Sequence, residues 1–259
     1  MAVFSPTVVC QPRSHDLVEA PSEIRGAGIG FEGREILGLL HEAGAATVER
    51  RYARGEILFG EGDPGDALYV LTEGAMKLSR GCPGGKEVTL MVLGPWEFFG
   101  DLAIGSRAYQ HARAEAITAC RVSKVPKVFV ERALKTRPEM AFMVIDLLRL
   151  ELARHREMAA CLFPHKAETK LARLLPLLAR RFGEREDVGV VIRLRLTQAE
   201  LARMISSTRE SVNHALASLR RQGVLALIAG RMVILDPAGL EYLASGTVVE
   251  KGTSPDLTW

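Results

Sequence analysis

The stretch from Leu196 to Arg221 constrains the fold of this chain more than any other. Thr197 is followed three residues later by Glu200, the spacing of a capping box in which each side chain accepts a hydrogen bond from the other residue's backbone N–H. Around Ser207 the pattern changes to residues that favour turns and caps, and Ser207 and Glu210 repeat the capping-box spacing. The stretch therefore predicts two short helices joined by a tight turn.

The second helix of this pair has one apolar side and a polar start. Val212, Leu216 and Leu219 fall on one helical face, and the first turns carry side chains able to reach base edges in the major groove of DNA. This arrangement predicts a helix-turn-helix, whose second helix enters the groove. An ordinary helical hairpin with a solvated polar face is the alternative. The residues expected to contact DNA are Thr197, Ser207, Thr208, Arg209, Glu210, Asn213 and His214.

The residues after the second helix favour DNA binding over that alternative. Gly223 is typical of a helix C-terminus, and the β-rich runs 224–228 and 232–235 are joined by a turn that contains Gly230, which predicts a β-wing. Residues 165–235 carry 13 lysines and arginines against 6 aspartates and glutamates, a net charge of +7, whereas the whole chain carries +3 and the remainder therefore −4. Positive charge is concentrated where a phosphate backbone would lie, which predicts a winged-helix DNA-binding module.

The remaining composition is that of an ordinary two-domain protein. The 259 residues are 47% hydrophobic and 25% charged, and no apolar run approaches the roughly 18 residues of a membrane helix. The first 25 residues lack a basic segment followed by an apolar core, so we expect a cytoplasmic protein without a membrane partner. The cysteines are far apart and lack metal-ligand spacing, which favours reduced structural thiols and no metal site. They are Cys10, Cys82, Cys120 and Cys161.

Between Ile36 and about Cys120 the sequence consists of short β-rich runs separated by Gly- and Pro-containing turns. This texture predicts a small antiparallel barrel or jelly roll. A cupin-type metal centre in such a barrel would need several histidines, and between Ile57 and Ala119 the sequence holds His111 alone. We also find no nucleophile–base pair and no glycine-rich phosphate loop, so we do not expect an enzyme.

After Pro138 the period of the apolar residues changes to that of a helix with a heptad seam. Because a second apolar stripe through Met140 and Val144 is available to pack on the barrel, the seam is free for a symmetry-related chain. A long helix that packs its seam on its own barrel is the alternative. Phe163 and Pro164 predict the hinge to the DNA-binding module. The residues expected at the dimer interface are Ile145, Leu148, Leu152, His155 and Ala159.

This order of parts resembles the cyclic-AMP receptor and Fnr-type (Crp–Fnr) transcription regulators, over roughly residues 34–245. The matching motifs are Gly-Glu-Gly-Asp at 60–63, Phe-Phe-Gly-Asp-Leu at 98–102, the heptad helix, and Thr-Arg-Glu-Ser-Val at 208–212. The resemblance implies a bacterial protein of the α+β class: an N-terminal double-stranded β-helix (a jelly roll like that of cyclic-nucleotide-binding domains), a long dimerisation helix and a C-terminal winged helix-turn-helix. We expect the division 1–30 (flexible extension), 31–135, 136–162, 163–245 and 246–259 (flexible tail).

In the family, an Arg and a Glu at the positions of Arg209 and Glu210 read base edges, and hydroxyls like those of Thr197 and Thr208 touch phosphates. Arg is able to hold O6 and N7 of guanine with two hydrogen bonds, and Glu accepts from N4 of cytosine. Where the family commonly has a third Arg, this chain has His214. The resemblance therefore implies two base-reading positions and leaves the third open.

The effector cassette departs from the family pattern. The family has Phe-Gly-Glu and, nine residues after the Glu, an Arg-Ser/Thr-Ala that holds the cyclic phosphate. This chain has Asp101 and then Gln110-His111, and an uncharged Gln is unable to form the bidentate ion pair that Arg makes with phosphate. The family's adenine-contacting Thr-Ser pair aligns with His155 and Arg156. The candidate effector-pocket residues are Gly100, Asp101, Gln110, His111, His155 and Arg156.

The sequence thus predicts a homodimeric, sequence-specific transcription regulator that binds a pseudo-palindromic operator in double-stranded DNA and acts with RNA polymerase. We expect its DNA binding not to depend on cyclic AMP; a vestigial pocket and a pocket for a different small effector both stay open. Two other functions stay open as well. One is a cysteine-based redox or metal sensor, and the other is a cyclic-nucleotide-binding protein whose helical module contacts a protein.

Overall fold

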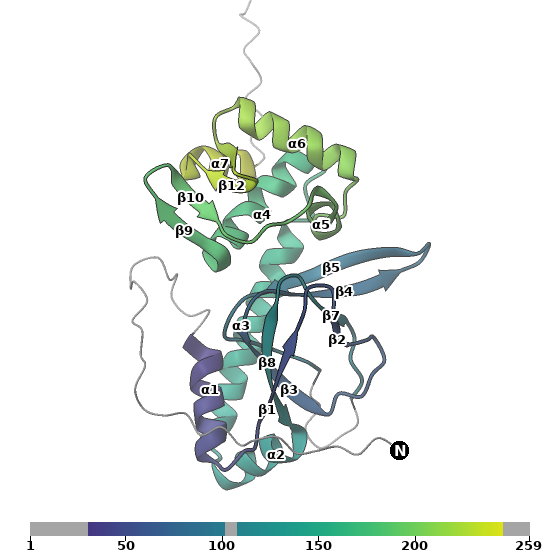
Figure 1. The fold of residues 1–259 in the computed structure, drawn as a ribbon, viewed down its shortest axis with the longest axis vertical. Helices are drawn as coiled ribbons and strands as arrows, with labels where there is room; N and C mark the ends of the chain where they lie inside the picture. The colour runs from purple at the N-terminus through teal and green to yellow at the C-terminus, as the bar shows by residue number, and fades with distance from the viewer. Residues whose placement is uncertain (1–30, 102–107, 246–259) are drawn as a thin grey trace, which may run out of the picture.

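The N-terminal half of the chain is a small antiparallel β-roll. The structure, a computed structural model, describes residues 31–101 and 108–245 (Figure 1). The sequence predictions for 1–30 and 246–259 lie outside these residues. Two four-stranded sheets, in the orders β1-β8-β3-β6 and β2-β7-β4-β5, face each other, which confirms the predicted jelly roll. The strands are β1 (Val48–Tyr52), β2 (Ile57–Phe59), β3 (Ala67–Glu73), β4 (Met76–Cys82), β5 (Lys86–Leu93), β6 (Glu97–Phe99), β7 (Arg113–Ala116) and β8 (Cys120–Pro126).

The predicted limits of the β-rich region were wrong at both ends. Its first residues form a helix, α1 (Phe31–Glu42), and its last strand, β8, continues to Pro126. Helical spacing places Ile36 and Leu40 on the buried side of α1. The apolar residues of α1 therefore belong to the helical layer outside the barrel.

The first of the two sheets has an apolar surface on each face because successive side chains of a strand point in opposite directions. In β3, Tyr69 and Leu71 pack inside the barrel, with Phe59 and Phe99 near Tyr69. Val70 packs in a separate cluster with α1, α2 (Lys127–Thr136) and the start of α3. The barrel thus has a helical layer on one side.

The long helix predicted after Pro138 is α3 (Met140–Ala160), a helix of 21 residues. It runs from the region of α2, past the β-roll, to the C-terminal domain (Figure 1). Only residues 161–166 separate its end from α4. The helix is therefore placed to contact both domains.

The C-terminal domain is the predicted winged helix-turn-helix. Its helices pack around Leu171, Leu175, Val212 and Leu219, and its sheet has the order β11-β12-β10-β9. The β9–β10 hairpin and the last helix were not predicted. The elements are α4 (Ala167–Phe182, with Pro176 inside it), β9 (Gly183–Glu186), β10 (Gly189–Ile192), α5 (Gln198–Met204), α6 (Arg209–Arg221), β11 (Leu225–Ile228), β12 (Arg231–Ile234) and α7 (Pro237–Ser245).

The two domains share one hydrophobic cluster. Ala75, Val92 and Ile117 of the β-roll and Met158 of α3 lie in the same cluster of buried residues as the core of the C-terminal domain. Because apolar area from both domains is removed from water together, this contact stabilises one relative placement of the domains. None of the described helices is long and apolar enough to cross a membrane.

Candidate DNA-binding surface and effector pocket

The first helix of the helix-turn-helix begins as its sequence predicts. The backbone N–H of Glu200 donates to Oγ1 of Thr197 at 3.2 Å, and the N–H of Thr197 donates to Oε2 of Glu200 at 2.5 Å. Both bonds of the capping box are therefore present, so two backbone N–H groups at the start of α5 have partners.

The predicted second capping box, between Ser207 and Glu210, is wrong. The N-cap of α6 is Thr208, whose Oγ1 accepts from the N–H of Ser211 at 3.1 Å. Ser206 has a φ of 48°, and the N–H of Ser207 donates to the carbonyl of Ala202. Ser207 is therefore used in the turn, which is one residue longer than the sequence pattern indicates.

The outward side of α6 carries most of the predicted DNA contacts. Arg209, Glu210, Asn213 and His214 are all exposed, as is the capping Thr208, while Val212 is fully buried. Helix α6 lies at the end of the molecule opposite α2, so this side faces solvent (Figure 1). Of the other predicted contacts, Thr197 is exposed at the start of α5 and Ser207 is half-buried.

The electrostatics of this surface suit hydrogen bonding to bases. A hydrogen bond from its own backbone N–H, together with the Thr208 hydroxyl, holds the pKa of the Glu210 carboxyl below its ordinary value. Glu210 is therefore an ionised acceptor at neutral pH. Nε2 of Gln198 donates to Oδ1 of Asn213 at 3.1 Å. Sequence reasoning did not predict this contact of Gln198, although the position of Gln198 in the first turn of α5 could have indicated it.

The wing is a β-hairpin with a two-residue loop. Ala229 and Gly230 join β11 to β12 with φ values of 49° and 74°. Two successive positive φ values are typical of the turn that matches the twist of paired strands. Helix α6 ends at Arg221, and the N–H of Gly223, which has a φ of 74°, donates to the carbonyl of Arg220, as expected for a C-terminal glycine.

A buried carboxylate joins the two domains and the long helix. Glu97 of β6 is 1% exposed, and its Oε1 lies 3.1 Å from Nε of Arg181 in α4 and 3.6 Å from Nη1 of Arg154 in α3. Its Oε2 accepts from the N–H of Gly94 at 2.7 Å. Sequence reasoning missed this cluster, although Glu97 shares a strand face with the buried Phe99 and is therefore a charged residue in an apolar position.

A second ionic contact lies between β5 and α5. Oε2 of Glu87 is 3.8 Å from Nε of Arg203 and 3.7 Å from Nζ of Lys77, and Oε1 accepts from the Ser79 hydroxyl at 2.6 Å. Burial raises the pKa of the Glu87 carboxyl, but the Ser79 hydrogen bond and these cations outweigh it and hold the pKa below its ordinary value. The first helix of the DNA-binding motif is therefore in ionic contact with the β-roll.

The heptad residues of α3 are uncovered in the single chain. The exposed fractions of Ile145, Leu148 and Leu152 are 60%, 57% and 50%. His155 and Ala159 are exposed too. The barrel therefore leaves at least half of each of the side chains of Ile145, Leu148 and Leu152 uncovered, which disfavours the alternative in which the seam packs on its own barrel. Phe142, 73% exposed, extends the apolar stripe and was not predicted.

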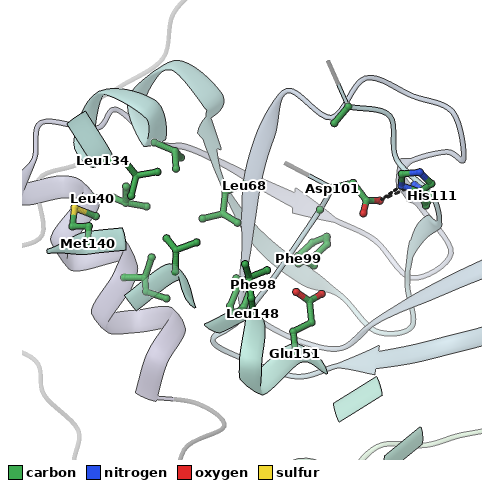
Figure 2. Close-up of a pocket in the computed structure, with 15 residues that line it drawn as sticks. Leu40, Leu68, Phe98, Phe99, Asp101, His111, Leu134, Met140, Leu148 and Glu151 are labelled. Carbon is green, nitrogen blue, oxygen red and sulfur yellow. Dashed lines mark hydrogen bonds and ion pairs between the residues drawn. The ribbon is translucent and has the colours of Figure 1, made fainter. Parts of the chain in front are cut away.

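A pocket of about 440 Å³ lies between α1, α2, α3 and the first sheet (Figure 2). Of the predicted effector residues, Gly100, Asp101 and His111 line it. The N–H of His111 donates to Oδ2 of Asp101 at 2.7 Å, and Nδ1 of the ring lies 3.5 Å from the same oxygen. Leu148 and Glu151 are the most C-terminal residues of α3 that line the pocket.

The other predicted effector residues do not line this pocket. Gln110 is 1% exposed, and its Oε1 accepts from the N–H of Asp101 at 3.0 Å, while its Nε2 has no acceptor among the described residues. His155 and Arg156 are exposed on α3, and Nε2 of His155 lies 3.8 Å from Oε1 of Glu151. The sequence did not indicate the contribution of α1 and α2, because their helical layer was not predicted.

The described cysteines are free thiols. Cys82 is exposed, whereas Cys120 and Cys161 are buried, and burial raises the pKa of Cys120 and raises that of Cys161 to about 11. A thiol with a raised pKa forms little of the reactive thiolate. Cys10 lies outside the described residues. No group of three or more His, Cys, Asp and Glu side chains in the described part of the chain is arranged to hold a metal ion.

A β-roll of this topology, a long helix with an uncovered seam and a winged helix-turn-helix define a class of DNA-binding transcription regulators with a cyclic-nucleotide-type sensor domain. Residues 49–137 match the cyclic nucleotide-binding domain family, and residues 169–243 match the Crp-like helix-turn-helix domain family. The chain belongs to the Crp–Fnr family of transcription regulators, whose members are not enzymes.

Two curated relatives and one solved structure illustrate the similarity. The CRP-like cAMP-activated global transcriptional regulator of Mycobacterium tuberculosis is 32% identical over 185 residues, 71% of this chain and 83% of that protein. The global nitrogen regulator of Synechococcus elongatus is 30% identical over 210 residues, 79% of this chain and 95% of that protein. A crystal structure of a CRP-family transcriptional regulator from Thermus thermophilus has 31% identity and a TM-score of 0.64, and covers 78% of this chain and 100% of that one.

Proposed function

We propose that the chain is a homodimeric regulator that reads a pseudo-palindromic DNA site through α6 and does not require cyclic AMP for this. The observation that carries the proposal is the outward side of α6, where Arg209, Glu210, Asn213 and His214 are exposed together beside the capped helix start. Arg209 is able to donate to the edge of a guanine, and Glu210 is able to accept from the edge of a cytosine. Thr197, Ser207 and Thr208 lie at or beside the starts of α5 and α6, where their hydroxyls would contact phosphates.

The exposed seam of α3 supports the proposed dimerisation. Large apolar side chains at heptad spacing with exposed fractions of 50% or more are typical of a surface that a second chain covers. Ile145, Leu148 and Leu152 would form its centre, and His155 and Ala159 would continue it toward the C-terminal domain. A two-fold dimer presents two recognition helices to half-sites about 34 Å apart.

The surroundings of Gln110 support the proposed independence from cyclic AMP. A cyclic phosphate is an anion, and a buried anion needs a charged hydrogen-bond partner. Gln110 is buried, uncharged and bound to the backbone of Asp101. The neighbouring His111 is in contact with a carboxylate, Asp101, which a phosphate would have to approach. Gly100 and Asp101 therefore keep the Gly-acid part of the family's motif, while the Arg that holds the phosphate is replaced by Gln110.

The proposed division of the chain places the sensor domain at 31–135, the dimerisation helix at 136–162 and the DNA-binding domain at 163–245, with RNA polymerase as the protein partner at promoters. The test is selection of bound duplexes from a random pool by the full chain, with and without cyclic AMP. We expect a two-fold symmetric consensus in both conditions. Equal recovery of all sequences would contradict specific reading, and a consensus obtained with cyclic AMP alone would contradict the independence.

A further inference from the structure

We propose that the pocket between α1, α2, α3 and the first sheet binds an apolar small molecule that carries a cationic amine at one end. The proposal concerns the ligand of the sensor domain and goes beyond the proposed function, since it requires neither DNA binding nor dimerisation. It is based on the shape of the pocket, its apolar lining and the charges at its polar end (Figure 2).

The size and lining of the pocket suit an apolar ligand. Its volume of about 440 Å³ lies within the range of roughly 300–1,000 Å³ typical of small-molecule sites. Side chains from four elements line its apolar end: Leu40 of α1, Leu68 of β3, Leu134 of α2 and Met140 of α3. Figure 2 shows these residues on one side of the pocket, away from Asp101 and Glu151. A hydrocarbon or aryl group placed among them is removed from water, which favours binding.

The other end of the pocket is acidic. Asp101 and Glu151 both line it, and no Lys or Arg is among its described lining residues. The ionisable groups nearby include His111, 3.5 Å from Asp101, and His155, 3.8 Å from Glu151. Asp101 accepts the backbone N–H of His111, and since an ionised carboxylate has about four acceptor positions, both Asp101 and Glu151 have capacity for a new donor.

This charge distribution favours a ligand that carries a positive charge. An ammonium group near Glu151 would form a charge-assisted hydrogen bond. A carboxylate or phosphate there would meet two carboxylates, and like charges at close range disfavour binding. A neutral hydroxyl would lie between these cases. Among ligands of the same shape, we therefore expect the cation to bind most tightly, the neutral molecule less tightly and the anion least tightly.

The ligand would also touch the seam of α3. Leu148 lines the pocket and is 57% exposed at the proposed dimer interface, and Glu151 is one helical turn before Arg154, the partner of the buried Glu97. A molecule held by Leu148 and Glu151 thus contacts the same helix that joins the dimer seam to the C-terminal domain.

The experiment measures fluorescence titrations of the full-length chain with three probes that share an anthracene ring and carry an aminomethyl, a hydroxymethyl or a carboxylate group. We expect saturable binding of one probe per chain, with the aminomethyl probe tightest and the carboxylate weakest. Glu151→Gln should weaken the aminomethyl probe about tenfold and leave the hydroxymethyl probe unchanged. The matched control is Asp146→Asn, which removes an exposed carboxylate from the same helix, where Asp146 pairs with Arg149, and should change neither.

A pocket-filling variant tests the location. Val144→Phe adds volume to a lining residue of α3 and should weaken all three probes, with folding checked by circular dichroism. The proposal is overturned if the carboxylate probe binds as tightly as the aminomethyl probe, if binding does not saturate, or if Asp146→Asn weakens the amine as much as Glu151→Gln does. Operator binding measured on the same samples tests the proposed function separately. A loss of DNA binding would leave the relative affinities of the three probes unchanged.

Discussion

Replacing Glu97 with Gln tests the contact that joins the β-roll, α3 and α4. The substitution keeps the size of the side chain and removes its charge. Arg181 has a side-chain exposure of only 11% and lies 3.1 Å from Oε1 of Glu97, so its guanidinium group would remain largely buried beside a neutral side chain. Breaking a buried ion pair from one side costs about 3–5 kcal/mol. Because the Gln oxygen is still able to accept one hydrogen bond, we expect about 3 kcal/mol, at the lower end of that range.

Urea denaturation followed by circular dichroism measures this loss in the free energy of unfolding. Glu49→Gln is the matched control, because Glu49 has a side-chain exposure of 55% and lies 3.8 Å from Arg121. An exposed pair of this kind contributes about 1 kcal/mol at most. The double variant with Arg181→Gln should cost less than the sum of the single changes, because the second substitution removes the cation whose charge Glu97 no longer balances. A loss below about 1 kcal/mol for Glu97→Gln, or strict additivity in the double variant, would refute the reasoning.

Three further predictions concern the seam, the recognition helix and the β5–α5 contact. Replacing Leu148 and Leu152 together with Glu should yield monomers in sedimentation, since charges would enter the centre of the proposed interface. Arg209→Ala should lower operator affinity by about 1–3 kcal/mol and relax the preference at one guanine per half-site, whereas Arg220→Ala should affect all duplexes alike. The lowered pKa of Glu87 stabilises the fold above pH 4.5, and this contribution should be lost as the pH falls through the folded-state pKa, so acid denaturation of Glu87→Gln should be less pH-dependent there.

Each of these predictions has an outcome that contradicts it. Dimers that persist after both leucines are replaced would show that the seam is elsewhere. Equal losses on random and specific duplexes would make Arg209 a phosphate contact. An unchanged acid-denaturation profile in Glu87→Gln would show that Glu87 contributes no pH-dependent stability.

The parts that sequence predicted best are those specified by local rules. The capping box at Thr197 and the helix-ending Gly223 each depend on residues within a few positions of one another, and each has the predicted place in the structure. The second capping box failed for a local reason as well. The spacing of Ser207 and Glu210 fits the pattern, but the left-handed conformation of Ser206 lengthens the turn and makes Thr208 the cap.

The features that sequence missed depend on contacts between distant segments. The importance of Glu97 comes from Arg154 and Arg181, which lie 57 and 84 positions further along the chain. The pocket brings Leu40, Leu68 and Leu134 together from three elements, and one of these, α1, was read as part of the β-rich region. Residue types and short-range spacing carry no information on such pairings. The alternation in β6, which puts Glu97 on the same strand face as the buried Phe99, was the one local signal, and it was not used.

The packing of α6 has a consequence for how regulators of this kind change their targets during evolution. Its inward side packs on α4, α5 and β11, and the contacts that attach the domain to the β-roll come from α4 and α5, through Arg181 and Arg203. The outward residues, among them Arg209 and His214, are exposed and take no part in those contacts. Substitutions there are therefore free to alter the preferred DNA sequence while the attachment between the domains is inherited unchanged. A gene duplicate would acquire a new set of target promoters without having to rebuild the link to its sensor.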